Sequence, residues 1–260
     1  MTFSICETSR ERRVAAREGA RYVLGIGGNR LALVLAGIAC AVVSFFSFFA
    51  VWVGSSALGM LPIGEILGAE TFFGWCVMHL LILAVFWLLA MPLWLGMYRM
   101  AIFMVDGSEV NGKTFLYYVA SADSYGRALG ISVRLILRWL PAFVGYVVMR
   151  SFFDYDLVGL LLVVLFVSTL VFSLFLVGAL GGFVTLAVSN DSMSMDRAKR
   201  TAAKILDGDR MCDFGFHLGM VWRILLSLLL AGVPLVLHTL PFTMLSAVCY
   251  VSRLSVRDDI

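Results

Sequence analysis

The sequence predicts an all-α protein: a polytopic transmembrane bundle of about six helices, with amphipathic helices on its inner surface. Of the 260 residues, 61% are hydrophobic and 14% are charged, whereas soluble domains carry roughly a quarter charged residues. The apolar residues form unbroken runs that approach or exceed the ~20 residues that a helix needs to cross a bilayer. These observations exclude an ordinary soluble fold, and the net charge of +3 requires no nucleic-acid partner.

The first 30 residues are basic, and we expect residues 1–30 to form a cytoplasmic N-terminal surface segment. Residues 9–24 can form an amphipathic helix in which Val14 and Tyr22 lie among arginines, ending near Gly25. Such a helix is expected to lie on the inner face of the membrane.

Residues 31–254 are predicted to form the six-helix transmembrane domain, and residues 255–260 a short cytoplasmic tail. The first four crossings are expected at about 31–53, 71–98, 132–149 and 157–189. Residues 221–251 are expected to hold two short crossings, because Gly232, Pro234 and Pro241 interrupt this run. Pro92 predicts a kink or a tilt in the second crossing.

Two polar segments are expected on the inner side. Residues 99–131 are predicted to be a polar connection that contains a turn at 106–108 and a short helix at 113–122. In the second segment, residues 194–206 are predicted to form a helix with an apolar stripe opposite a basic face. The stripe consists of Met195, Ala198, Ala202 and Ile205, and the basic face of Arg197, Lys199, Arg200 and Lys204.

The distribution of basic residues predicts the topology. With the N-terminus inside and six crossings, all of the 20 Lys and Arg residues except Arg150 lie on the inner side, as the positive-inside rule demands. We therefore expect a multi-pass protein of a cytoplasmic (inner) membrane with both ends inside. A five-helix alternative moves only Arg253 and Arg257, so charge does not decide between the two.

The C-terminal half carries a set of residues that suggests a family: Asn190-Asp191-Ser192, a basic helix, Gly208, Phe214, Phe216, Trp222, Gly232, Pro241 and Tyr250. Together with the segment 17–31, this pattern covers most of the chain and resembles the domain-of-unknown-function 975 family of bacterial six-helix membrane proteins. That family is similar to the membrane domain of glycerophosphoryl diester phosphodiesterases, although nothing in the chain resembles their soluble catalytic domain. The resemblance implies an architecture and no established activity.

Few residues suggest chemistry inside the membrane. His79 is the one clearly ionisable residue deep in a predicted crossing, which makes it a candidate intramembrane polar site. A neutral histidine bonded to a neighbouring helix is the simpler interpretation. His217 and His238 lack metal-ligand spacing, and no hydrolase, nucleotide-binding or paired-carboxylate motif occurs. We therefore predict a non-enzymatic protein with no catalytic, cofactor or metal site.

The basic helices suggest contacts with anionic lipid head groups, each basic residue contributing ~1 kcal/mol near the surface. The candidate contacts are Arg13, Arg17, Arg21, Arg197, Lys199, Arg200 and Lys204. As an alternative, these basic residues serve only to fix the orientation of the helices in the membrane, as the positive-inside rule describes. Five acidic residues are expected to form a solvated or lipid-facing mosaic with these charges: Asp191, Asp196, Asp207, Asp209 and Asp213.

Three functional hypotheses follow. The first is a membrane protein that binds lipid or amphiphiles or supports envelope maintenance, with anionic membrane lipids as its partners. The second is a transporter or channel-like protein for a small or apolar substrate, which the proline breaks and two similarly spaced turn-to-Trp segments favour. The third is an accessory subunit of a membrane complex. The sequence identifies no protein partner.

Overall fold

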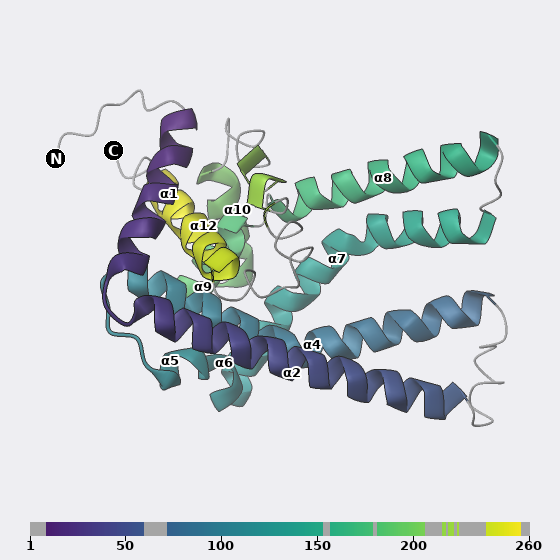
Figure 1. Cartoon of the computed structure of the whole chain (residues 1–260), viewed down its shortest axis with the longest axis horizontal. Helices are drawn as coiled ribbons and strands as arrows, with labels where there is room; N and C mark the ends of the chain where they lie inside the picture. The colour runs from purple at the N-terminus through teal and green to yellow at the C-terminus, as the bar shows by residue number, and fades with distance from the viewer. Residues whose placement is uncertain are drawn as a thin grey trace. The chain divides into compact units, whose positions relative to one another are not determined.

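The computed structural model describes residues 9–59, 72–152, 157–178, 181–205, 215–216, 218–220, 223 and 238–255, and the regular structure in these ranges is entirely helical (Figure 1). The helices are α1 (Ser9–Gly25), α2 (Asn29–Gly59), α4 (Phe72–Val105), α5 (Gly112–Phe115), α6 (Tyr117–Ala120), α7 (Ala122–Phe152), α8 (Leu157–Gly178), α9 (Gly181–Ser189), α10 (Met195–Ile205) and α12 (Leu240–Ser255). The predicted all-α class is confirmed.

Three helical stretches within these ranges are long and apolar enough to cross a membrane. They are Asn29–Ser47 in α2, Leu88–Val105 in α4 and Ala122–Met149 in α7. Two shorter apolar stretches lie at Gly159–Ser173 and Leu240–Ser252. Helices of this length and composition are typical of integral membrane proteins.

The predicted polar connection at 99–131 is wrong at both ends. Helix α4 continues through Arg99 to Val105, because the charge of Arg99 is paired inside the protein and six apolar residues follow it. Helix α7 begins at Ala122, ten residues before the predicted third crossing. The expected short helix is present as α5 and α6, which are separated at Leu116.

The other helix boundaries in the described residues differ less from the predicted ones. Run 157–189, predicted as one helix, is described as α8 and α9, with residues 179–180 outside the described ranges. The helix expected at 194–206 is present as α10. Most of 221–251, including the predicted break between two short crossings, lies outside the described residues, and α12 covers its last part.

The chain forms two compact units, and α2, α4 and α7 each contribute to both. Unit 1 comprises Met1–Ile38, Leu93–Ser124 and Gly178–Ile260, and unit 2 comprises Ala39–Pro92 and Tyr125–Val177, so far as these ranges are described. In α4 the boundary follows Pro92, where the proline ring removes one backbone hydrogen bond from the helix.

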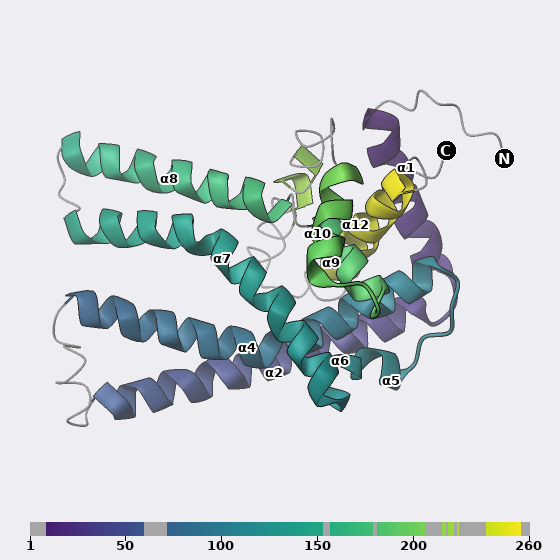
Figure 2. The same ribbon diagram turned by 180° about the vertical axis from the view of Figure 1, so that it is seen from behind.

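In unit 2, α7 and α8 lie side by side as an antiparallel pair (Figures 1 and 2). The side chain of Thr169 in α8 approaches the backbone of α7 closely at Gly145, where a Cβ atom would collide with the Thr169 hydroxyl. One turn earlier, the backbone N–H of Ala142 donates a hydrogen bond to Ser173 Oγ at 3.0 Å. A residue that follows a helical proline often loses its intrahelical partner, and here Pro141 precedes Ala142. A side chain of α8 thus satisfies the backbone of α7.

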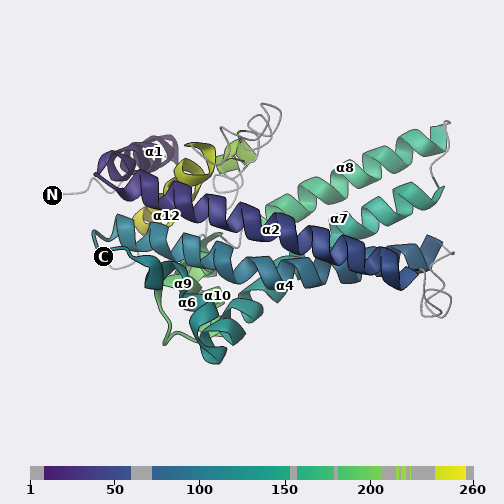
Figure 3. The ribbon, with the colours of Figure 1, turned by 60° about the horizontal axis from the view of Figure 1, so that its bottom comes forward.

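In unit 1, α1 packs along α12 (Figure 3). The contact face of α1 carries small residues: Ala16 and Ala20 are fully buried, and a Cβ on Gly19 would lie 3.3 Å from Cys249 Sγ. Small side chains allow two helices to approach closely. The amphipathic helix predicted at 9–24 is therefore present, with one face covered by protein.

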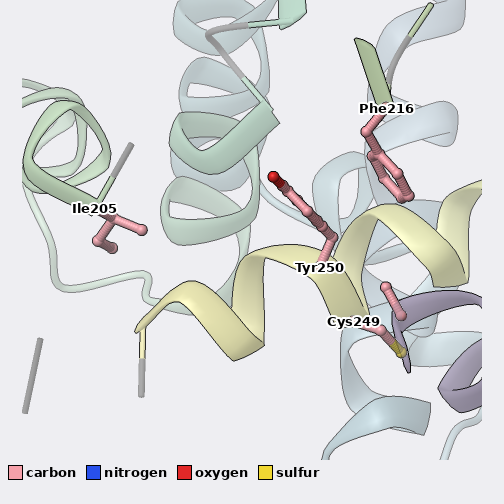
Figure 4. Close-up of a cluster of buried hydrophobic side chains, with 5 residues drawn as sticks. Ile205, Phe216, Cys249 and Tyr250 are labelled. Atoms are coloured by element: carbon pink, nitrogen blue, oxygen red, sulfur yellow. The ribbon is translucent and has the colours of Figure 1, made fainter. Parts of the chain in front are cut away.

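Helix α10 packs against α9 in the same unit (Figure 2). Ala198, Ala202 and Ile205 of its predicted apolar stripe are buried. Ile205 joins a buried cluster with Ala16, Phe216, Cys249 and Tyr250 (Figure 4), in which the Phe216 and Tyr250 rings stack at 4.5 Å between centroids. This cluster contains residues of α1, α10 and α12, so these three helices pack around a shared core.

Candidate functional site

The first candidate site is the basic face of α1. Arg13, Arg17 and Arg21 follow one another at four-residue spacing, so they lie along one side of the helix. Arg13 and Arg17 are half-buried, and Arg21 is exposed. The face that carries Ala16 and Ala20 is buried against α12, so the arginine row flanks a packed surface.

A fourth arginine, which the sequence did not predict to be part of this site, joins the row. Gly215, Gly219 and Arg223 repeat the same four-residue spacing on a neighbouring segment. A Cβ on Gly215 would lie 3.8 Å from Arg13 Nη1, and one on Gly219 would lie 4.0 Å from Arg17 Nη2. The two rows therefore run in register, with guanidinium groups beside glycine backbone.

The charges in this row repel one another. Burial, followed by repulsion from Arg223, Arg13 and Arg21, lowers the pKa of the Arg17 guanidinium below its ordinary value. Arg17 forms no hydrogen bond or ion pair with any residue in the described ranges. The arrangement favours an anion that could accept hydrogen bonds from several guanidinium groups.

The second candidate site is the basic face of α10. All four predicted side chains are exposed: Arg197, Lys199, Arg200 and Lys204. The helix is well capped, because Ser194 Oγ accepts a hydrogen bond from the N–H of Arg197 at 3.3 Å and Lys204 lies in the last turn. With its apolar stripe covered by α9, the helix offers only its basic side to a ligand.

A third site, around Arg99, is absent from the sequence predictions. Arg99 is 9% exposed and forms a two-hydrogen-bond ion pair with Asp191, with Nη1–Oδ1 at 2.9 Å and Nη2–Oδ2 at 2.8 Å. Its Nη1 also donates to the carbonyl oxygen of Val188 at 3.1 Å. Because Val188 lies in the last turn of α9, this carbonyl lacks a helical partner and favours a cation.

Aromatic residues cover the guanidinium of Arg99. Its Cζ lies 3.8 Å from the ring centroid of Tyr117 and 5.3 Å from that of Phe103. Tyr117 is held close because α4 carries Gly96 at this level, where a Cβ would collide with the carbonyl oxygen of Phe115. Next to Arg99, the Tyr98 hydroxyl hydrogen-bonds Thr185 Oγ1 at 2.8 Å. The site joins α4, α6 and α9.

Asp191, one of the acidic residues of the predicted mosaic, is exposed, but its carboxylate pairs with the buried Arg99, a partner that the sequence did not predict. Its turn is fixed locally: Asn190 Oδ1 accepts hydrogen bonds from the N–H and the hydroxyl of Ser192 at 3.1 and 2.8 Å. Asp196 is exposed, as expected. Asp207, Asp209 and Asp213 lie outside the described residues.

A signal for the Arg99 site was present in the sequence. An arginine followed by the apolar run 100–105 is more consistent with a helix that continues than with one that ends. An ionisable residue in such a helix requires a partner. No comparable signal identified Arg223, because its proximity to α1 depends on tertiary packing.

His79 lies within α4, but its side chain is outside the described part of the structure, and so is His217. His238 stacks on Phe242, with 5.9 Å between ring centroids. Within the described ranges, no three His, Cys, Asp or Glu side chains gather closely enough to hold a metal ion.

Comparison of the chain with protein-family models, curated proteins and solved structures gives no match. The resemblance to the domain-of-unknown-function 975 family therefore stays a prediction that rests on the residues quoted for it.

Proposed function

We propose that the chain is a non-enzymatic, multi-pass protein of a cytoplasmic-type membrane that binds anionic lipid head groups through the basic faces of α1 and α10. It crosses the membrane six times and keeps both ends inside. Three described stretches that could span a membrane support the membrane assignment.

The proposal rests on one observation: each of these two helices has one face packed against protein and another face that carries accessible basic side chains. Each buries its small or apolar face against another helix of unit 1, α1 against α12 and α10 against α9. Each leaves a row of basic side chains at least partly accessible. On α10, protein packing thus replaces insertion of the apolar stripe into lipid, whereas on α1 the side chains of Val14 and Tyr22 stay exposed. Electrostatic attraction is the interaction that both helices offer to the membrane surface.

The distribution of charge supports the same orientation. Every described Lys and Arg residue outside Arg127, Arg134, Arg138 and Arg150 belongs to unit 1. A concentration of basic residues in one part of a membrane protein is typical of its cytoplasmic side. Anionic lipids of the inner leaflet would meet these residues there.

The test compares lipids retained by the purified protein. The protein is extracted in a neutral detergent and titrated with phosphatidylglycerol or phosphatidylcholine, and bound lipids are counted by native mass spectrometry. We expect a preference for phosphatidylglycerol that weakens as salt increases. Replacing Arg197, Lys199, Arg200 and Lys204 together by Gln should remove much of this preference.

A charge-preserving variant is the matched control. Arg197→Lys with Arg200→Lys keeps the net charge of α10, so it should retain the preference for phosphatidylglycerol. If the wild-type protein binds both lipids equally at low salt, the proposed function is wrong.

A further inference from the structure

The arginine row of α1 and the glycine row beside it form a more specific arrangement than a basic helix face. Arg13 lies beside Gly215 and Arg17 beside Gly219, and Arg223 continues the second row by one turn. Both glycines lack a side chain at the positions where these guanidinium groups approach the backbone. The guanidinium groups of Arg13 and Arg17 therefore lie close to Gly215 and Gly219 rather than extending freely into solvent.

The charge of this arrangement is not balanced at Arg17. Arg17 is half-buried, the neighbouring charges that lower its pKa are those of arginines, and none of the described carboxylates is paired with it. Partly buried like charges destabilise a fold unless an opposite charge joins them. A bound anion would supply that charge.

The chemistry of guanidinium groups restricts the anion. Each group presents a planar fork of N–H donors that matches the oxygens of a phosphate or a carboxylate. A tetrahedral phosphate can accept such forks from several directions at once, which suits donors that come from two different segments. The arginines of α1 also lie shortly before the candidate span Asn29–Ser47 in the sequence, so we expect them near the phospholipid head groups.

We propose that Arg13, Arg17 and Arg223, arranged beside Gly215 and Gly219, form a defined site for one phosphate group, that of an anionic phospholipid. This inference rests on the proposed function and deepens it, because it replaces diffuse attraction at α1 by a single site of fixed stoichiometry. Arg17 is the central donor of the site, and Arg21 adds charge at its exposed edge.

The test uses the full-length protein in a neutral detergent, with short-chain phosphatidic acid, phosphatidylcholine and inorganic phosphate as separate probes. The wild-type protein should bind one phosphatidic acid per chain with measurable saturation. Arg17→Gln should weaken this binding about tenfold or more, the effect of losing a hydrogen bond to a charged group. The variant should fold, because it removes a half-buried and repelled charge.

A second variant separates a built site from general electrostatics. Gly219→Leu keeps every charge but places a bulky side chain beside the Arg17 guanidinium, so it should weaken binding as Arg17→Gln does. Its matched control is Gly126→Leu, a helical glycine with no atom within 4 Å of its Cβ position among the described residues. Arg30→Gln, at an exposed arginine, is the matched control for loss of charge.

The outcomes are distinct. Loss of saturable binding in Arg17→Gln and Gly219→Leu, with both controls unaffected, supports the site. If Arg17→Gln weakens binding no more than Arg30→Gln while the preference for anionic lipid persists, the site is wrong and the proposed function stands. If inorganic phosphate saturates the site and phosphatidic acid does not, the lipid source is wrong. If the wild-type protein shows no preference for anionic lipid, both inferences fail.

Discussion

Arg99 and Asp191 form an ion pair through two hydrogen bonds of 2.9 and 2.8 Å, linking the C-terminal part of the long apolar helix α4 to the turn that follows α9. The pair is asymmetric: the side chain of Arg99 is 10% exposed, whereas that of Asp191 is 37% exposed. Because Arg99 is the more deeply buried member of the pair, its charge depends more strongly on the ion pair than that of Asp191 does. The carbonyl oxygen of Val188 and the rings of Tyr117 and Phe103 also contact its guanidinium group.

Replacing Asp191 by Asn should destabilise the protein, because Arg99 would lose its charged acceptor while remaining buried. A hydrogen bond to a charged group contributes about 1.5–3 kcal/mol, and the partial exposure of Asp191 places the expected loss near the lower end of that range. Thermal unfolding in detergent measures the effect. Glu109→Gln, which makes the same change at an exposed residue, is the matched control and should leave the midpoint unchanged.

A double-mutant cycle tests whether the pair itself is responsible. Arg99→Gln and Asp191→Asn should together cost less than the sum of the single variants, because either one alone breaks the same interaction. Additive losses would show that the two residues act independently, contrary to the geometry.

Gly96→Ala should destabilise unit 1 by about 1–3 kcal/mol or more, the usual cost of overpacking a filled interior. The added Cβ would collide with the backbone oxygen of Phe115, and backbone cannot move aside as a flexible side chain can. Gly126→Ala is the control, and it should be neutral or slightly stabilising because alanine favours a helix and the position is open. Thermal unfolding of both variants provides the measurement, and equal midpoints would contradict the close approach.

Ser173→Ala should cost about 1–3 kcal/mol, because it would leave the buried N–H of Ala142 without its acceptor. Ser168 lies on the same helix but donates to the carbonyl of Val164 in its own backbone and is exposed. Ser168→Ala should therefore change stability by less than ~0.5 kcal/mol. A smaller effect at Ser173 than at Ser168 would be inconsistent with the α7–α8 contact.

Local patterns predicted the surface helices well. Helix α10 was predicted because Ala198, Ala202 and Ile205 recur at helical spacing opposite four basic residues, and amphipathic periodicity is a strong signal. Helix α1 was predicted from the apolar residues that lie among its arginines and from the glycine at its end. The residues predicted to contact lipid head groups accordingly lie on the faces of helices that the structure contains.

The sequence analysis did not predict the tertiary contacts of the candidate sites. Arg99 was assigned to a loop because a charge usually ends an apolar run, whereas its partner lies 92 residues further along the chain. The approach of Gly215 and Gly219 to α1 likewise depends on how separate segments pack. A single sequence does not reveal which distant residues meet, even where residues such as Gly215 and Gly219 recur at helical spacing.

The proposed orientation predicts which positions face the cytoplasm. Single cysteines are introduced at Lys113 on α5 and Ala203 on α10, both exposed and both in unit 1, after the native cysteines have been replaced by alanine. A third is introduced at Glu65, in the segment that the sequence predicts to be an outer loop.

A membrane-impermeant maleimide should label the first two cysteines only in inverted membrane vesicles, and the third only in right-side-out vesicles. The reason is the positive-inside rule, because unit 1 carries most of the described basic residues. Detergent-solubilised protein, in which all three should react, controls for accessibility. Labelling of Lys113→Cys and Ala203→Cys from opposite sides would contradict the six-crossing topology, since that topology places an even number of crossings between these two positions.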